Sequence, residues 1–339
     1  MSASALVWLG GSDFELRAID LPQPGDGEIL VRVDTATVCG SDRHSVTGRR
    51  PAAFPSILGH EGVGHIEATG SDAVLVDGSP ARVGDRVVWS VTAPCMQCDR
   101  CIQGRTAKCR AVLKTGHEPI DGPWPLSGTY STHILLRQHQ PVVQVPPEVA
   151  DGSAAAAGCA LATVMAAVEA AGTLNGRSVL ISGVGMLGLM AAAVALTQGA
   201  ALVEVSDPDP RRVALAAELG AEESLSDAPM DVVFDFSGNI GAVGDCFERL
   251  DIGGVLVLVG SVSPGPVVPI DPERLVRGWH TITGVHNYEP RHLQEAVDFL
   301  TTYGRMIDWD QVLSESVRLD EVPDLFNRRP TALREVVSI

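Results

Sequence analysis

The hydrophobic positions of the chain follow two different patterns, and the change from one to the other falls between residues 147 and 178. The first 150 residues contain many short apolar alternations separated by Gly, Pro and Asp, such as 29–33, 63–68 and 86–90. Alternation of this kind predicts short strands with one buried face. The first part of the chain is therefore predicted to be a β-rich domain that ends at Pro146 and Pro147.

The second pattern alternates strand-like and helix-like segments. Residues 154–171 are rich in alanine, which has the highest helix propensity, and are predicted to be helical. Strands are predicted at 179–181, 202–206, 232–236, 255–259 and 281–285, with helices at 186–198, 211–219, 240–250 and 291–302 and a last strand at 335–339. This alternation predicts an α/β fold with a parallel sheet covered by helices on both faces.

Composition narrows the function classes. The 339 residues suggest two domains, and the 45% hydrophobic content is ample for large cores. The net charge of -17, without a basic stripe, argues against nucleic-acid binding, which needs clustered Lys and Arg. Residues 1–8 lack the basic start and apolar core of a signal peptide. The apolar stretch 179–196 fits a strand, turn and helix better than a membrane span, because glycines interrupt its first half.

Four of the seven cysteines form a compact cluster with the spacing C-x2-C-x2-C-x7-C. Four thiolates can enclose one tetrahedral zinc, which is typical of a structural site. Disulfides are the alternative, but close spacing in a long chain without a secretory signal favours metal. No hydrophobic run lies between the cysteines, and the intervening Met96, Gln97, Asp99, Arg100 and Gln103 predict an exposed loop. The cluster comprises Cys95, Cys98, Cys101 and Cys109.

Three scattered residues are interpreted as ligands of a second zinc. Cys39, His60 and Cys159 would supply two thiolates and an imidazole, which leaves the fourth position open, as in catalytic sites. Cys159 lies in an alanine-rich helix start, so a packed thiol is its alternative. Cys246 has no companion motif and is predicted to be a packed or free thiol.

A dinucleotide-binding fingerprint lies near the start of the second part of the chain, where strands and helices alternate. It follows a β-branched strand and opens a helix, which is the context the G-x-G-x-x-G pattern requires. The first glycine permits the turn, the second admits the pyrophosphate, and the third allows the helix to pack on the strand. The fingerprint is Gly183-Val184-Gly185-Met186-Leu187-Gly188.

The residue that ends the next strand favours NAD over NADP. Asp207 lies about 20 residues beyond the fingerprint, where a carboxylate binds the adenine ribose and repels a 2′-phosphate. A helix N-cap is its alternative role. Arg212 and its neighbour Arg211 weaken the preference, because a flexible arginine can meet a phosphate.

Together these motifs resemble, in the same order, those of the zinc-dependent medium-chain alcohol dehydrogenases. The resemblance covers essentially the whole chain and rests on the loop 39–44, the segment Gly59-His60-Glu61-Gly62-Val63-Gly64, Gly158-Cys159-Ala160, the four-cysteine lobe and the nucleotide fold. It implies a GroES-like β-rich catalytic domain at 1–160 with a zinc lobe at 95–109, a Rossmann domain at 161–286, and a return to the catalytic domain at 287–339. It also implies two zinc ions per chain, NAD as cofactor, and hydride transfer with an alcohol, aldehyde or ketone.

The resemblance assigns further roles to single residues. Ser41 would take the alcohol proton and pass it through the cofactor ribose to His44, for which a plain surface histidine is the alternative. Asp42 would orient His60, and Glu61 would lie near the metal. Arg334 would reach the cofactor pyrophosphate, with a solvated strand charge as its alternative.

The substrate itself is the least determined part of the prediction. The adjacent Arg49 and Arg50 lie between the relay loop and the zinc segment and are able to hold a phosphate, phosphonate or carboxylate. The stretch, together with His286, somewhat resembles dehydrogenases associated with phosphonate catabolism. A solvated arginine pair and a polyol or neutral alcohol are the alternatives.

Three broader expectations complete the prediction. The chain is expected to be cytoplasmic, to form a homodimer or homotetramer, and to have small-molecule partners without nucleic acid or membrane. A zinc-free reductase of the same superfamily is disfavoured by the complete ligand set. A non-catalytic binding protein on the same scaffold is disfavoured because the ligands and Ser41 are all present.

Overall fold

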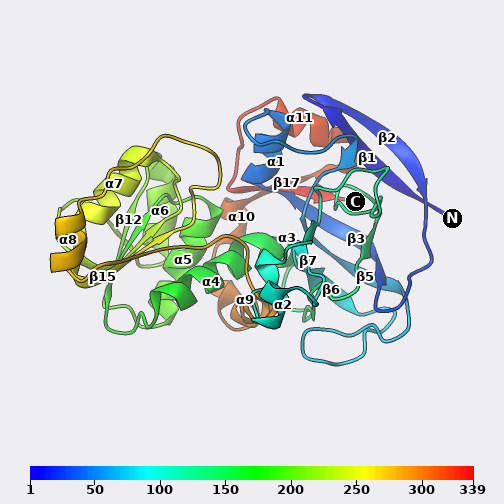
Figure 1. Cartoon of the computed structure of the whole chain (residues 1–339). Coiled ribbons are helices and arrows are strands. Elements are labelled where there is room, and N and C mark those ends of the chain that lie inside the picture. The colour runs from blue at the N-terminus through cyan, green and yellow to red at the C-terminus, as the bar shows by residue number, and fades with distance from the viewer. The chain divides into compact units, whose positions relative to one another are not determined.

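The computed structural model describes residues 1–339, and the chain folds into two units (Figure 1). Unit 1 comprises residues 1–162, 289–304 and 309–339, and unit 2 comprises residues 163–288 and 305–308.

Unit 1 is built on a seven-stranded sheet with the order β10-β6-β5-β3-β18-β17, in which β9 also pairs with β3. Alternate side chains of these strands, including Val31, Ile66 and Val87, are fully or almost fully buried in one core. The strands predicted at 29–33 and 63–68 are confirmed within β3 and β5, and the one predicted at 86–90 is confirmed as β6 except for Ser90. The strands are β3 (Ile29–Val38), β5 (Glu61–Thr69), β6 (Arg86–Trp89), β9 (His133–Leu136), β10 (Val142–Gln144), β17 (Leu313–Arg318) and β18 (Arg334–Ser338).

Smaller elements complete unit 1. A three-stranded sheet joins β1 (Ser2–Gly10), β2 (Asp13–Asp20) and β4 (Ser56–Ile57), and a hairpin joins β7 (Thr92–Ala93) to β8 (Leu113–Lys114). The helices of unit 1 include α1 (Gly40–Val46), α2 (Asp99–Ile102), α9 (Pro290–Tyr303), α10 (Trp309–Val312) and α11 (Val322–Phe326), with 3-10 turns at Thr106–Lys108 and Leu319–Glu321 and a further turn at Gly304–Met306 that continues into unit 2. The helix predicted at 291–302 is confirmed as α9.

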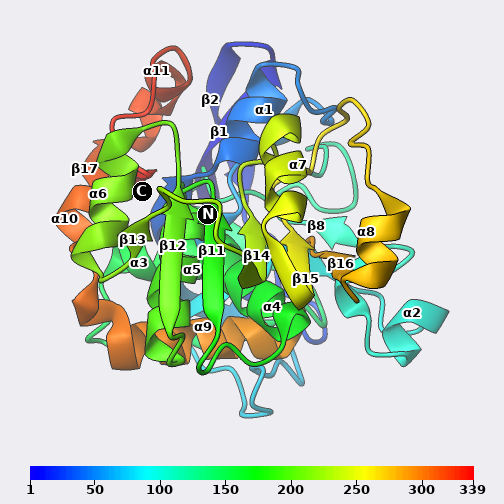
Figure 2. The same ribbon diagram turned by 90° about the vertical axis from the view of Figure 1, so that its left-hand side faces the viewer.

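Unit 2 contains a six-stranded parallel sheet with the order β13-β12-β11-β14-β15-β16. Figure 2 shows β12, β11, β14 and β15 side by side. The chain moves outward from β11 in one direction through β12 and in the other through β14 and β15. Right-handed crossovers therefore place α5 and α7 on opposite faces of the sheet. The predicted doubly wound α/β arrangement is confirmed.

The elements of unit 2 lie close to their predicted positions, and the apolar stretch 179–196 forms a strand, a turn and most of a helix. The strands are β11 (Ser178–Ser182), β12 (Leu202–Ser206), β13 (Glu222–Glu223), β14 (Met230–Asp235), β15 (Leu250–Leu258) and β16 (Thr281–Gly284), and the helices are α5 (Met186–Thr197), α6 (Pro210–Glu218), α7 (Ile240–Glu248) and α8 (Pro272–Arg277).

The helix predicted at 154–171 is longer and less regular than its sequence indicates. It begins as α3 (Asp151–Ala156), passes through a π-helical turn at Ala157–Leu161, and continues as α4 (Ala162–Ala171). By length and composition the stretch Asp151–Ala171 could cross a membrane, but 83% of its most apolar 18-residue segment is buried inside the protein. Burial of this kind is typical of a core helix.

Candidate functional site

Three elements of unit 1 bring the scattered candidate ligands together. Cys39 is the N-cap of α1, His60 directly precedes β5, and Cys159 lies in the π-helical turn. Their ligand atoms and a carboxylate oxygen of Glu61 all lie within 4.8 Å of one another. Two thiols, an imidazole and a carboxylate form a donor set that suits zinc, so the residues present fit the metal.

The backbone before His60 has a conformation that only glycine adopts easily. Gly59 has a φ of +87°, and a Cβ atom there would lie 2.3 Å from Thr129 Oγ1 and 2.8 Å from the Tyr130 ring. Glycine is therefore needed at this position both for backbone freedom and for space. The G-H-E segment thus fixes the direction from which His60 enters the site.

The two thiols of the site differ in acidity. A hydrogen bond from Cys159 is the main cause that lowers the pKa of Cys39 well below its usual value, and the Arg334 guanidinium acts in the same direction. The same hydrogen bond raises the pKa of Cys159. Cys39 is therefore the more acidic thiol of the two, and a cation held in the site would favour loss of the Cys159 proton as well.

Asp42 lies behind the imidazole, as the resemblance implied. Its Oδ1 lies 3.4 Å from His60 Nδ1, and both atoms are buried without another hydrogen-bond partner. Burial disfavours a charged His60, but the Asp42 carboxylate and Cys39 together outweigh burial and raise the pKa of His60 well above its usual value. A carboxylate at Nδ1 leaves Nε2 as the metal-facing nitrogen.

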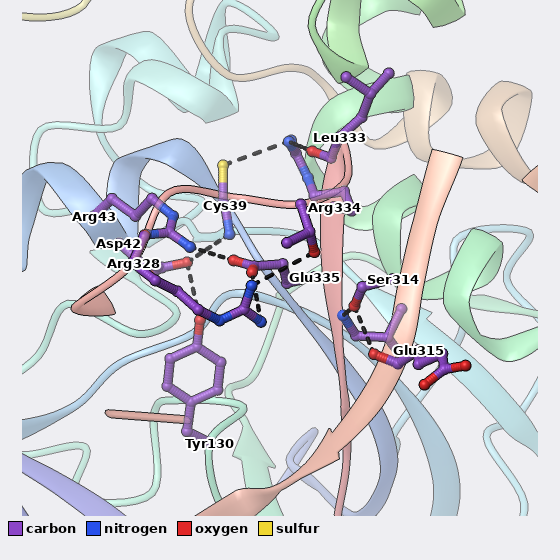
Figure 3. Close-up of polar contacts among 12 residues, drawn as sticks. Cys39, Asp42, Arg43, Tyr130, Ser314, Glu315, Arg328, Leu333, Arg334 and Glu335 are labelled. Atoms are coloured by element: carbon purple, nitrogen blue, oxygen red, sulfur yellow. Dashed lines mark hydrogen bonds and ion pairs between the residues drawn. The ribbon is translucent and has the colours of Figure 1, made fainter. Parts of the chain in front are cut away.

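Arg334 forms a buried ion pair with Glu61. Its Nε and Nη2 donate to the two Glu61 oxygens at 2.9 and 3.2 Å. Figure 3 shows the contact of the same guanidinium group with Cys39, where Nη2 lies 3.7 Å from Sγ. Thr37 Oγ1 donates to Glu61 at 2.5 Å. The fully buried Glu61 carboxylate is therefore held by two partners beside the ligands. The predicted contact between Arg334 and a cofactor pyrophosphate stays a prediction, while its alternative as a solvated charge is wrong.

The next residue on β18, Glu335, faces a different pair of cations. Its carboxylate pairs with Arg43 of α1 and, at 3.1 Å, with Arg328 (Figure 3). Glu335 is only 2% exposed, so these two arginines neutralise a buried charge. The last strand of the chain thereby ties α1, which carries the predicted proton relay, to the sheet.

The predicted relay residues lie on α1. Ser41 Oγ is 3.3 Å from His60 Nε2, which places the hydroxyl group beside the candidate metal centre. His44 lies one turn further along the helix and is half-buried rather than fully at the surface. Burial and the charges of Arg49 and Arg50 lower the pKa of His44, which keeps its imidazole neutral and able to accept a proton near neutral pH.

Sequence reasoning missed a second imidazole at this centre. The His117 ring lies with its centroid 5.6 Å from that of His60. Burial and the charges of His60, Arg50 and Lys114 lower the pKa of His117 well below its usual value. Arg50 also acts on His44 and Lys114, so these basic groups share one region. His117 carries no ligand spacing, and only its position in the fold reveals it.

The cysteine lobe is assembled as expected. The sulfur atoms of its four cysteines lie within 4.8 Å of one another, and all seven cysteines of the chain are free thiols. Backbone N–H groups lower the pKa of Cys98 to about 6, whereas burial raises the pKa of Cys101 to about 12. The cysteines Cys101 and Cys109 are buried, whereas the residues between the cysteines that were predicted to be exposed are exposed, namely Met96, Gln97, Asp99, Arg100 and Gln103.

A carboxylate from the start of α9 holds the lobe. Glu289 accepts hydrogen bonds from the backbone N–H of Thr106 at 2.9 Å, from the Thr106 hydroxyl group, and from the backbone N–H of Ala107 at 3.1 Å. Thr106 and Ala107 are only 7% and 5% exposed. Glu289 lies 183 residues from Thr106, so no local pattern indicated this contact.

The glycine-rich turn of unit 2 has the geometry of the fingerprint. Gly183 has a φ of +88°, and a Cβ atom at Gly188 would lie 2.0 Å from the Gly183 carbonyl oxygen. A Cβ atom at Gly185 would meet no other part of the chain within 4 Å. The turn is therefore tight where helix meets strand and open where a phosphate would approach. Met186 is buried and Leu187 half-buried in the first turn of α5.

Asp207 is joined to this turn. Its carboxylate accepts hydrogen bonds from the backbone N–H of Val184 at 2.8 Å and of Asp209 at 2.9 Å, and Arg212 Nη1 lies 3.5 Å away. Asp209, not Asp207, is the N-cap of α6. The N-cap alternative for Asp207 is therefore wrong, and Arg212 is near the carboxylate as expected.

A cavity of about 580 Å³ lies beside β11 and α7 and reaches the last residues of β11 and β12, Ser182 and Ser206. Ligands of doubly wound folds bind outside the carboxyl ends of the strands. Its lining includes Ser182, Ser206 and Leu225, together with Ala242 and Cys246 of α7. Burial raises the pKa of Cys246 to about 12, so this residue is a packed thiol. His286, in contrast, is exposed in unit 2, and Arg49 is exposed in unit 1.

Comparison with known proteins agrees with this geometry. Residues 25–147 match the alcohol dehydrogenase GroES-like domain, and residues 186–302 match the zinc-binding dehydrogenase domain. The chain is 30% identical over 297 residues to an L-threonine 3-dehydrogenase of Chelativorans sp. (strain BNC1), covering 81% of this chain and 80% of that protein. Sorbitol dehydrogenase of Bacillus subtilis (strain 168) is 26% identical over 346 residues, with coverage of 96% and 92%.

A solved structure extends the likeness to the fold. Alcohol dehydrogenase from Thermotoga maritima superposes with a TM-score of 0.92 at 26% identity, covering 100% of this chain and 99% of that one. The domains and relatives define an oxidoreductase of the zinc-binding dehydrogenase class. The chain belongs, within that class, to the zinc-dependent medium-chain alcohol dehydrogenase family.

Proposed function

We propose that the protein is an NAD-dependent dehydrogenase that interconverts an alcohol and its aldehyde or ketone at the site formed by Cys39, His60 and Cys159. The observation that carries this proposal is the cluster of their ligand atoms within 4.8 Å, with Ser41 Oγ 3.3 Å from His60 Nε2. Zinc held there would act as a Lewis acid that favours loss of the alcohol proton near neutral pH.

The residues around the ligands would then move the proton. Ser41 would accept it from the alcohol, and His44 would receive it at the other end of α1. The lowered pKa of His44 keeps the imidazole neutral before transfer and favours release of the proton after it has been accepted. Asp42 would keep His60 oriented, and Glu61 would remain beside the ligands in its pair with Arg334.

NAD would bind in unit 2 at the turn formed by Gly183, Gly185 and Gly188. The open space at Gly185 and the N-terminus of α5 suit a pyrophosphate. Asp207 supports NAD over NADP, because its carboxylate lies at the turn and would repel a 2′-phosphate. Arg334 and Arg212 are proposed as additional cofactor contacts.

The decisive experiment is a count of metal ions in a ligand variant. His60→Ala should lower zinc from about two to about one ion per chain and abolish nearly all turnover, because the open site loses one of its three protein ligands. The lobe should keep its metal, which a Cys101→Ala variant measured in parallel would lose. Two zinc ions and a normal rate in His60→Ala would refute the ligand assignment.

For the substrate, we propose an alcohol that carries an anionic group such as a phosphonate, phosphate or carboxylate. The Arg50 charge lowers the pKa of Lys114, His117 and His44 beside the candidate metal centre, and Arg49 also acts on His44, so Arg49, Arg50 and Lys114 bring positive charge to this region. Such a gathering of cations favours an anion. A polyol or neutral alcohol is the second candidate, favoured by the similarity to a sorbitol dehydrogenase and an L-threonine 3-dehydrogenase.

Substrate charge is testable with matched alcohols. Charge-assisted hydrogen bonds contribute ~1.5–3 kcal/mol each, so 2-hydroxyethylphosphonate should exceed a neutral alcohol of similar size in kcat/KM by roughly ten- to a hundredfold. The double variant Arg49→Ala/Arg50→Ala should lose this preference and keep its rate with the neutral alcohol. Equal preference in both proteins would remove the arginines from substrate recognition.

We further propose a homo-oligomer in the cytoplasm. Strand β16 is an edge of the unit 2 sheet, and apolar residues near it in sequence are exposed, including Val276 at 70% and Trp279 at 81%. An uncovered sheet edge with apolar neighbours suits pairing with a second copy. The seven free thiols suit a reducing compartment.

A further inference from the structure

A tyrosine lies behind the imidazole of the candidate metal centre. Tyr130 is fully buried, and its hydroxyl group donates to Asp42 Oδ2 over 3.2 Å (Figure 3). The same oxygen accepts a 2.9 Å hydrogen bond from the backbone N–H of Cys39. Two donors from different parts of the chain therefore hold one side of the Asp42 carboxylate.

The other side of the carboxylate faces the ligand. Asp42 Oδ1 lies 3.4 Å from His60 Nδ1 and has no other hydrogen-bond partner. Because Oδ2 is fixed by two donors, the carboxylate is not free to turn Oδ1 away from the imidazole. The orientation of His60 thus depends on the hydrogen bond between Tyr130 and Asp42, neither of which is a metal ligand.

The ring of Tyr130 acts on the same ligand through the backbone. The Tyr130 backbone N–H donates to the Leu58 carbonyl oxygen at 3.1 Å, and its ring atoms lie 2.8 Å from the position that a Cβ atom of Gly59 would occupy. Burial and the Asp42 carboxylate raise the pKa of Tyr130 well above its usual value, so the hydroxyl group keeps its proton and remains a donor.

We propose that Tyr130 is a positioning residue of the metal centre, whose hydroxyl group fixes Asp42 and thereby the orientation of the His60 imidazole. The proposal goes beyond the proposed reaction, because it concerns how firmly one ligand is held and applies to any alcohol substrate. Hydrogen-bond partners of a metal-bound imidazole are known to influence metal affinity. Asp42 is such a partner of His60, and Tyr130 holds Asp42.

The first test removes one oxygen atom. Tyr130→Phe keeps the ring against Gly59 and deletes the hydroxyl group, while Tyr303→Phe deletes a hydroxyl group from a ring that is 44% exposed. In competition with a chelator, Tyr130→Phe should bind zinc at the open site about tenfold more weakly, at the lower end of the range for such partners. The cobalt-substituted protein should show shifted visible bands, and Tyr303→Phe should match the wild type in both measurements.

A double-mutant cycle separates positioning from general stability. The hydroxyl group acts through the Asp42 carboxylate, so Tyr130→Phe should change zinc affinity by less than about twofold in an Asp42→Asn background. An equal loss in both backgrounds would overturn the proposal, as would wild-type zinc affinity and cobalt bands in the single variant. A lowered melting temperature with unchanged metal binding would likewise assign Tyr130 a packing role only.

A second variant covers the case in which Tyr130→Phe is too unstable to purify. 3-Fluorotyrosine incorporated at position 130 alone keeps the ring and makes the hydroxyl group a stronger donor. It should bind zinc at least as tightly as the wild type and shift the cobalt bands in the direction opposite to that expected for phenylalanine. Cobalt bands identical to the wild type would refute the proposal.

Discussion

The contact between Glu289 and the cysteine lobe predicts how much the lobe is destabilised when the side chain of residue 289 has fewer oxygen atoms that accept hydrogen bonds. In Glu289→Gln, one carboxylate oxygen becomes an amide NH2 group, which does not accept hydrogen bonds. The wild-type carboxylate serves three donors, with Ala107 on Oε1 and both Thr106 groups on Oε2. The glutamine therefore leaves at least one of these donors without its acceptor.

The expected loss is that of one hydrogen bond to a charged group. Thr106 and Ala107 are 7% and 5% exposed, so water replaces the missing acceptor poorly. Such a bond contributes about 1.5–3 kcal/mol, which corresponds to a roughly 10- to 150-fold increase in local opening of the lobe. Opening would expose the thiols and speed the release of the lobe metal.

Hydrogen exchange of the zinc-loaded protein, monitored by mass spectrometry, measures this opening directly. Segment 95–109 should exchange faster in Glu289→Gln by the stated factor, and a metal-sensitive dye should trap zinc faster. Glu295→Gln is the matched control, because Glu295 is exposed on the same helix. If segment 95–109 exchanges at the wild-type rate in Glu289→Gln, the reasoning about acceptors is wrong.

Two further predictions concern charge. Asp207→Ser should weaken NAD binding by roughly ten- to a hundredfold through the lost charged acceptor and should relax the selection against NADP. Asp207→Asn keeps one acceptor for the backbone, so it should relax the selection with less effect on stability. A wild-type preference for NADP in steady-state assays would contradict the argument. The double variant Arg49→Ala/Arg50→Ala should raise the pKa of His44, since both guanidinium groups lower it in the wild type. An NMR titration of the ring protons measures the shift. An unchanged or lower pKa would show that the arginines do not act on this imidazole.

The parts of the molecule that depend on local patterns could be predicted from the sequence. Each metal-ligand motif and the glycine-rich turn is specified by a few neighbouring residues, because backbone conformation and ligand spacing are local properties. The strands and helices of unit 2 match the period of their apolar side chains for the same reason. These features lie where the sequence places them.

The parts that were missed depend on contacts between distant segments. Tyr130 lies 88 residues from Asp42, and Arg334 lies 273 residues from Glu61. Nothing in the neighbourhood of Tyr130 or His117 marks either residue as part of a metal centre. Arg334 had an expected partner in the cofactor, but its carboxylate partner became visible only in the folded sheet.

The π-helical turn at Ala157–Leu161 has a consequence for relatives of this chain. A π-turn is in effect one residue inserted into an α-helix. Removing one residue there would restore regular α-helical winding and leave the flanking segments in phase. The bulge that places Cys159 beside Cys39 and His60 would then be lost. A one-residue gap opposite this turn in an aligned relative should therefore accompany loss of the third ligand.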